Sequence, residues 1–230
     1  MAKSPAAGIS LRAFTKGCEA YWKREPRDAM YRIAARVVKD SWGNAGDTAD
    51  GLGVILLTWN QAAYRYGIFD FVALEDFLKS HRGTLEHYRG RSIKSFNSNH
   101  DAEKIKALFD EALAALKITR INRKSPVAVA KTLHIIAPRF FPLWDGAIAR
   151  GRSCRWYRSS AAASKYIAFM NDSQTIAASL EARYKQKQGR AGLPDARNLA
   201  AALSKQCGRS KTILKYLDEY FFAKYTGRWI

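Results

Sequence analysis

The chain has 230 residues, 47% of them hydrophobic, so it is long enough to bury a core as one compact domain or two small lobes. This composition argues against a disordered tail, and no run of about 18 apolar residues predicts a transmembrane helix. Its 39 Lys and Arg against 20 Asp and Glu give a formal charge of +19. Such an excess favours a polyanionic partner, with nucleic acid ahead of a membrane surface.

The start of the chain and its cysteines bear on compartment and cofactors. Residues 1–10 carry one lysine and lack the apolar stretch of a secretory signal, so we expect a cytoplasmic protein. Cys18, Cys154 and Cys207 are widely separated and form no CxxC or Cys/His cluster. We therefore predict packed, reduced thiols, no metal site and no cofactor.

Apolar residues recur at helical spacing over most of the chain, and strand-type alternation is nowhere sustained. The sequence therefore predicts an all-α fold. The clearest helical patterns cover 30–38, 52–63, 105–116 and 213–221, and a further helix is expected over 126–137. Polar segments at 41–50, 80–100 and 186–194 are expected to be loops.

We expect a monomer whose chain has three parts. Helices within 1–50 are expected to pack with the C-terminal part of the chain. A central helical lobe is expected over 51–120 and a second helical lobe over 121–230.

The most informative segment runs from Lys124 to Gly146. Ser125 is a good N-cap and Pro126 a good first helical residue, so a helix is expected to begin there and to end before the next proline. Its apolar stripe is predicted to leave Lys131, with Val127 and His134, on another face, with the lysine directed outward. Asp145 then precedes a further short helix that it is able to cap.

This segment resembles the active-site stretch of the helix-hairpin-helix DNA glycosylases. In that superfamily a hairpin leads into a helix that bears a lysine in the bifunctional members, and an apolar stretch then ends in a catalytic aspartate. Residues 142–145, Pro-Leu-Trp-Asp, resemble that ending, and Lys131 falls where the lysine would stand. The similarity spans roughly residues 50 to 150. It implies a compact two-lobed fold with a DNA-binding cleft between the lobes.

A second matching region lies upstream, over residues 56–61. It resembles the family's helix end whose polar side chain enters the duplex near the target base. The resemblance implies that Asn60 and Gln61 fill the gap left by a base flipped out of double-stranded DNA, supported by Trp59 or Tyr64. The alternative is a polar helix end with the tryptophan in the core.

The resemblance also implies a mechanism. The carboxylate of Asp145 would stabilise positive charge at the anomeric carbon or activate a water molecule, and Lys131 would add lyase activity by forming a Schiff base. Trp144 would form a wall of the base pocket, unless it lies in the core. His134 is expected to be a packed helix residue rather than a proton shuttle.

Two basic, aromatic-bearing stretches, over 82–96 and 150–158, are expected to contact DNA. The cations can bind phosphates while the rings stack on exposed bases, and the alternative is a solvated face with the rings in the core. The candidate DNA contacts outside the flipping region are Arg89, Arg91, Lys124, Ser125, Arg150 and Arg152.

The sequence leaves other functions open. Residues 124–129, Lys-Ser-Pro-Val-Ala-Val, stand where the family has a Gly-x-Gly hairpin, and this departure favours the alternative of a non-catalytic helical DNA-binding protein. An RNA-binding protein is a third possibility. If the chain is a glycosylase, its substrate is a damaged base in repair or a modified base in phage DNA, and it acts at the bacterial nucleoid.

Overall fold

The structure is a computed structural model that describes residues 8–64, 68–117, 124–190 and 198–230. Every regular element in these ranges is helical, which confirms the all-α prediction. The elements are α1 (Leu11–Arg24), α2 (Ala29–Asp40), α3 (Ala45–Trp59), α4 (Gln61–Tyr64), α5 (Phe71–Ser80), α6 (Arg82–Arg89), η2 (Ile93–Ser95), α7 (Ser98–Ala115), α8 (Pro126–Ile136), α9 (Gly146–Gly151), η4 (Ser159–Ala161), α10 (Ala162–Arg190), α11 (Leu199–Cys207), α12 (Ile213–Phe221) and the π-helical η5 (Phe222–Thr226).

Local sequence explains where most of these helices begin. A short polar side chain precedes the helix and accepts a hydrogen bond from a backbone N–H of the first turn, which satisfies a donor that has no partner within the helix. The capping residues are Ser10, Asn44, Asp70, Asn97, Ser125, Asp145, Asn198 and Thr212. The predicted helix over 126–137 is confirmed to within one residue.

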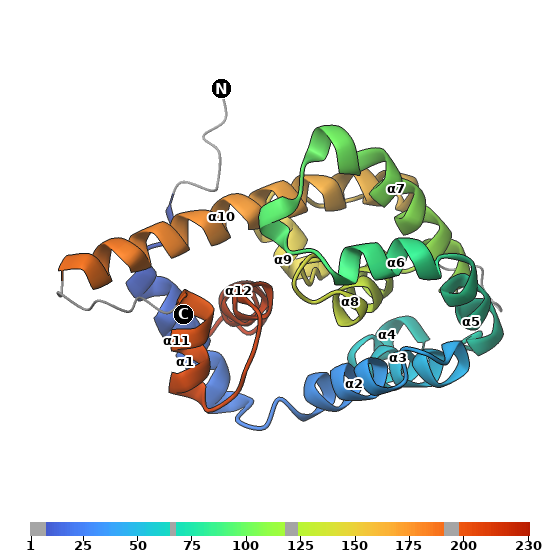
Figure 1. The fold of residues 1–230 in the computed structure, drawn as a ribbon, viewed down its shortest axis with the longest axis horizontal. Helices are drawn as coiled ribbons and strands as arrows, with labels where there is room; N and C mark the ends of the chain where they lie inside the picture. Colours follow the sequence, from blue (N-terminus) through green and yellow to red (C-terminus); the bar gives the residue numbers. More distant parts are fainter. Residues whose placement is uncertain (1–7, 65–67, 118–123, 191–197) are drawn as a thin grey trace.

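The helix α8 lies in the middle of the molecule, with the other helices around it (Figure 1). Helices α2, α3, α7 and α10 all pack against it. The long helix α10 runs beside α7 and extends past it toward α1 and α11 (Figure 1). This arrangement surrounds α8 with protein on every side.

The central position of α8 overturns one prediction. Lys131 was expected to be directed outward, but it is buried, with 8% of its surface exposed, as is His134 with 0%. A helix with neighbours all around it has no outward face, so its polar residues must find partners inside the protein.

The N-terminal segment divides between two regions. Helix α1 packs against α12, whereas α2 packs against α3 and α8. Helix α3 is continuous over residues 45–59, so the domain boundary expected at residues 50 and 51 falls inside a helix.

The predicted loops are shorter than expected. The segment 41–50 already contains the start of α3, because Asn44 caps it. The segment 80–100 holds α6, η2 and the first turn of α7. Helix α10 continues to Arg190, and the rest of the loop expected over 186–194 lies outside the described residues.

Candidate functional site

Lys131 supplies a buried amine near the middle of α8. Its Nζ donates a hydrogen bond to the backbone carbonyl of Trp59, 2.5 Å away, and lies 5.9 Å from the centre of that indole ring. Burial lowers the pKa of Lys131 from its ordinary 10.5 to about 8, and the charges of Asp145 and Asp218 offset only part of this effect. The amine is therefore partly neutral near physiological pH.

Asp145 caps α9, as the sequence predicted. Its Oδ1 accepts a hydrogen bond from the backbone N–H of Ile148 at 2.7 Å, and its Oδ2 accepts one from the hydroxyl of Thr226 at 3.0 Å. Asp145 forms no ion pair with Lys131, but its charge raises the pKa of that lysine, so the two groups are electrostatically coupled.

The region expected to flip a base lies against the start of α8. Asn60 Nδ2 donates a hydrogen bond to Ser125 Oγ at 2.9 Å, which joins the end of α3 to the cap of α8. Gln61 and Lys124 are exposed beside this junction. Tyr64 is buried instead, and its hydroxyl donates to the carbonyl of Leu116 at 3.0 Å, so it does not support Asn60 or Gln61 from the surface.

Trp59 is half-buried and has aromatic and cationic neighbours. Its ring stacks on Tyr31, with centroids 6.1 Å apart and an angle of 15° between the planes. The Tyr31 hydroxyl donates to Nε2 of His134 at 3.1 Å, because Nδ1 of that histidine donates to the carbonyl of Phe141. Burial lowers the pKa of His134 to about 3, so the ring stays neutral. It is a packed residue, in agreement with the prediction.

A second buried lysine, which the sequence did not predict, also lies near Trp59. Lys215 of α12 is fully buried, and its Nζ lies 2.9 Å from a carboxylate oxygen of Asp218. Its amine also lies 4.8 Å, 4.8 Å and 5.5 Å from the ring centres of Tyr21, Tyr31 and Trp59. No signal in the sequence indicated its burial, because Lys215 lies on the polar face of α12 with acids three and four residues later, a pattern that is typical of an exposed ion pair.

Two predicted phosphate contacts have partners within the protein instead. The guanidinium of Arg91 forms a bidentate pair with Asp101 at 2.7 and 2.8 Å. Arg152, 4% exposed, forms a similar pair with Asp172 at 2.7 and 2.6 Å. In the described structure neither guanidinium is a free cation, and their contact with DNA stays a prediction.

Trp144 belongs to the core. It is 1% exposed, and the rings of Phe109, Trp156, Tyr166 and Phe169 surround it. The alternative that the sequence left open, a core residue rather than the wall of a base pocket, is therefore the one observed.

The remaining basic residues differ in accessibility. Arg150 is exposed at the end of α9. Arg89 lies over the ring of Trp42, 4.1 Å from its centre, and donates to the carbonyl of Ile136. Tyr157 is 84% exposed, with Arg155 4.9 Å from its ring centre.

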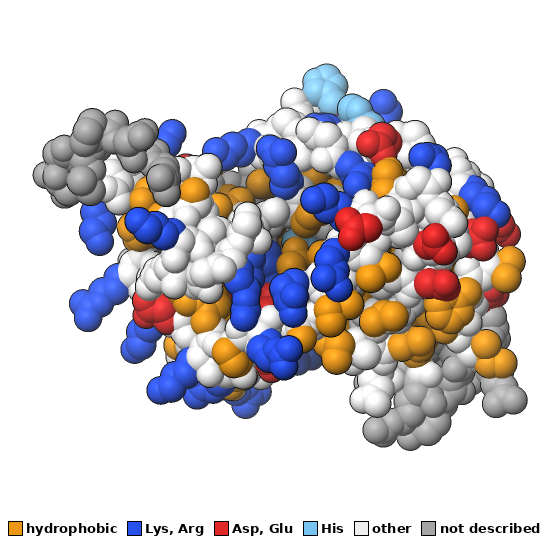
Figure 2. Space-filling model, turned by 60° about the horizontal axis from the view of Figure 1, so that its bottom comes forward, with side chains coloured by type: hydrophobic (Ala, Val, Ile, Leu, Met, Phe, Trp, Pro, Cys, Tyr) orange, Lys and Arg blue, Asp and Glu red, His pale blue; other side chains and the backbone are white. Residues whose placement is uncertain are grey.

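A cationic cleft of about 1230 Å³ opens between α2, the α6–η2 segment, the end of α8, and α11 with the segment that follows it. Figure 2 shows Lys and Arg side chains gathered around this hollow. Lys131 and Asp145 are not among the residues that line it. Eight Lys and Arg line it against three carboxylates: Arg32, Arg36, Lys39, Arg89, Lys94, Arg139, Arg209 and Lys211, with Asp28, Asp40 and Glu181.

Comparisons with family models, with curated proteins and with solved structures found no match for this chain. Among the described residues, no group of His, Cys, Asp and Glu is arranged to hold a metal ion. No helix in the described ranges is both long enough and apolar enough to cross a membrane.

Proposed function

We propose that this protein is a DNA glycosylase that acts as a monomer on double-stranded DNA, with Asp145 and Lys131 at its reacting centre. The observation that carries the proposal is the coupling of a buried amine of lowered pKa to a carboxylate at a helix N-terminus. Perturbed groups of this kind are typical of catalytic sites.

The lowered pKa of Lys131 suits a nucleophile, because only the neutral amine has a free lone pair. Near pH 7.5, about a quarter of an amine with a pKa of 8 is neutral, against about one in a thousand at 10.5. The Nζ lone pair of Lys131 bonds to C1′ of the deoxyribose as the glycosidic bond breaks, and the base leaves with the bonding electrons and takes up a proton. Loss of the proton from Nζ and opening of the sugar give a Schiff base, from which β-elimination cleaves the strand.

Asp145 has two roles on this proposal. Positive charge develops at the anomeric carbon as the base leaves, and a fixed carboxylate stabilises that charge more in the transition state than in the ground state. When water rather than Lys131 attacks, the same carboxylate accepts the proton. The hydrogen bonds from Ile148 and Thr226 keep the carboxylate in one position.

The duplex approaches the Ser125 end of α8 in this proposal. Gln61, exposed beside the junction of Asn60 and Ser125, fills the gap left by the flipped nucleotide, while Lys124 contacts the backbone. The protein then acts at the nucleoid, in repair or against phage DNA that carries modified bases.

Asp145→Asn tests this proposal, because asparagine keeps the cap and removes the charge. We expect release of free base from duplex DNA, measured by mass spectrometry on cellular and phage DNA, to fall by about 10²- to 10³-fold. Borohydride should trap the wild-type protein on DNA and fail to trap Lys131→Ala. The matched control is Asp70→Asn, the same change at the cap of α5, which should release base like the wild type. If Asp145→Asn releases base at the wild-type rate, the carboxylate has no part in the reaction.

A second function, DNA binding without catalysis, is favoured by one observation. Both carboxylate oxygens of Asp145 already accept hydrogen bonds from the chain, and the residue does not line the cationic cleft. A protein that binds duplex DNA but liberates no base from any substrate would have this function instead.

A further inference from the structure

We propose that the cationic cleft is a separate binding site for a single strand of nucleic acid, which it holds by its phosphates whatever its bases. This inference is independent of base removal, because Lys131 and Asp145 do not line the cleft. The cleft lies at the far end of α8 from Ser125, about 16 Å away along a helix of 11 residues.

One wall of the cleft carries a row of cations on α2. Arg32, Arg36 and Lys39 are spaced four and three residues apart, so they share one face of that helix, and all three are exposed. Within the part of the chain that the structure describes, none of them forms an ion pair. Like charges held together without counter-charges repel one another, and a bound anion relieves that repulsion.

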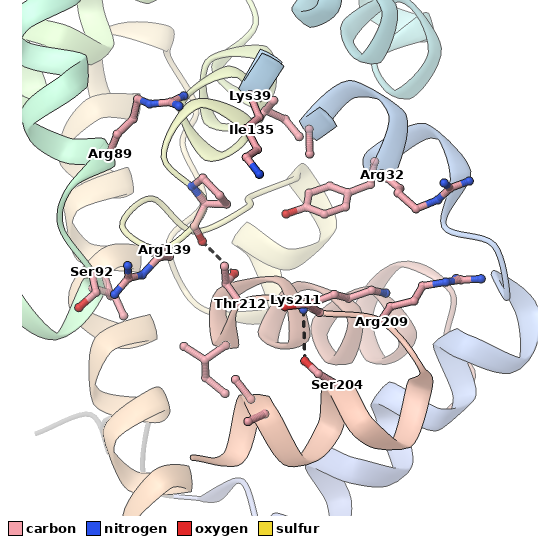
Figure 3. Close-up of a pocket in the computed structure, with 18 of the residues that line it drawn as sticks. Arg32, Lys39, Arg89, Ser92, Ile135, Arg139, Ser204, Arg209, Lys211 and Thr212 are labelled. Carbon is pink, nitrogen blue, oxygen red and sulfur yellow. Dashed lines mark hydrogen bonds between the residues drawn. The ribbon is translucent and has the colours of Figure 1, made fainter. Parts of the chain in front are cut away.

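Other cations reach the same hollow from separate elements. Arg139 follows α8, Arg209 precedes α12 and Lys94 belongs to η2. Figure 3 shows Arg139 beside Ser92 on one side, and Arg32 and Arg209 on the other. Cations on facing walls are able to contact the phosphates of one strand from both sides.

Two of the three carboxylates in the cleft are already engaged. Asp28 lies 2.9 Å from Nζ of Lys211, and Glu181 accepts a hydrogen bond from the backbone N–H of Leu199 at the start of α11. They therefore do little to neutralise the exposed arginines and lysines. The cleft keeps a net positive charge for an external anion.

The size and lining of the cleft indicate the class of ligand. Its volume of about 1230 Å³ exceeds the roughly 300–1,000 Å³ typical of a small-molecule pocket, which favours a strand over a single nucleotide. The aromatic residue in the lining, Tyr31, is buried, and its hydroxyl is bonded to His134. Without an exposed ring on which a base can stack, recognition goes through phosphates.

The test is the salt dependence of binding. Fluorescence anisotropy of a labelled oligo(dT) of about 20 nucleotides is measured with the full chain between about 50 and 200 mM salt. The variant Arg36→Ala/Lys39→Ala should bind roughly 10- to 100-fold more weakly, and its log–log salt slope should fall by about 1.4, or about 0.7 for each phosphate that the protein no longer neutralises. The control, Lys165→Ala/Lys185→Ala, removes the same charge from exposed positions of α10 and should behave like the wild type.

Other results would overturn the inference. It fails if the cleft variant matches the control, or if a duplex of equal length binds more tightly than the single strand. It also fails if the dissociation constants of oligo(dA) and oligo(dT) differ by more than about tenfold, because the protein would then recognise the bases as well as the phosphates. Displacement of the oligonucleotide by stoichiometric inorganic triphosphate would assign the cleft to a small polyphosphate instead.

The same variants separate this inference from the glycosylase proposal. Arg36→Ala/Lys39→Ala should release base from duplex DNA like the wild type, and Asp145→Asn should bind oligo(dT) like the wild type. Absence of base release from every variant, with loss of strand binding only in the cleft variant, would remove the glycosylase and leave the strand-binding site standing.

Discussion

Two buried lysines approach the ring of Trp59 from different helices, and their pKa values are shifted in opposite directions. Lys131 of α8 lies 5.9 Å from the ring centre and Lys215 of α12 lies 5.5 Å from it. The pKa of Lys131 is lowered to about 8, whereas that of Lys215 is raised well above its ordinary value. Both lysines are buried and both lie near the same ring, so neither feature explains why their pKa values differ.

The difference lies in the hydrogen-bonding and ionic partners. Burial lowers the pKa of Lys215 too, but Asp218, Glu219 and Asp28, with oxygens 2.9, 3.7 and 3.9 Å from its Nζ, more than offset that effect. Lys131 donates instead to a neutral carbonyl. A buried lysine thus stays a structural cation where carboxylates contact it and becomes a candidate nucleophile where they do not.

The largest expected effect comes from removing the paired lysine. Lys215→Met leaves Asp28 and Glu219 buried with Lys211 as their remaining close cation, so we expect the free energy of unfolding to fall by about 3 to 5 kcal/mol. Urea unfolding measures it, with the exposed Lys224→Met as control. Equal unfolding midpoints for the two variants would mean that the buried ion pairs contribute nothing that a methionine cannot replace.

Removing the unpaired lysine should have a smaller effect that depends on pH. Near pH 7, Lys131→Met loses one hydrogen bond but also a poorly compensated charge, so the free energy of unfolding should change by no more than about 1 kcal/mol. Between pH 8 and 10.5 the unfolded wild type binds more protons at this residue than the folded state does, so its stability rises with pH.

The Lys131→Met variant should lack that rise. Urea unfolding near pH 7 and near pH 9.5 compares it with the wild type and with Lys124→Met, which is exposed. If the free energy of unfolding changes by the same amount between the two pH values in all three proteins, the pKa of Lys131 is not lowered.

The smallest effect is expected from the carboxylate that acts on both lysines. Asp218→Asn should lower the pKa of Lys215 and of Lys131, because the Asp218 charge raises both. For Lys131 the shift is limited, since Asp145 acts on it as well. Mass spectrometry of reductive methylation should show faster labelling of Lys131 than in the wild type or in the exposed control Asp47→Asn. Slower labelling of Lys131 would contradict the assigned coupling.

The sequence predicted α8 and the cap of α9 well because both depend on neighbouring residues. Ser125, Pro126 and Asp145 act within one turn of helix, and their effects do not depend on the rest of the fold. The ion pairs of Arg91 and Arg152 could not be predicted from neighbouring residues. Their carboxylate partners lie ten and twenty residues further along the chain, and sequence alone does not show which acids meet which bases.

Composition and local pattern by themselves determined an all-helical protein with a large positive charge, because helical spacing, caps and charge are properties of neighbouring residues. The tertiary structure decided which cations are free and which are buried. Packing α8 at the centre enclosed Lys131 and His134, bringing α12 to Trp59 placed Lys215 among rings and carboxylates, and the meeting of α2, η2, α8 and α11 formed the cationic cleft. Desolvation and pairing depend on residues distant in sequence, so only the folded chain sets them.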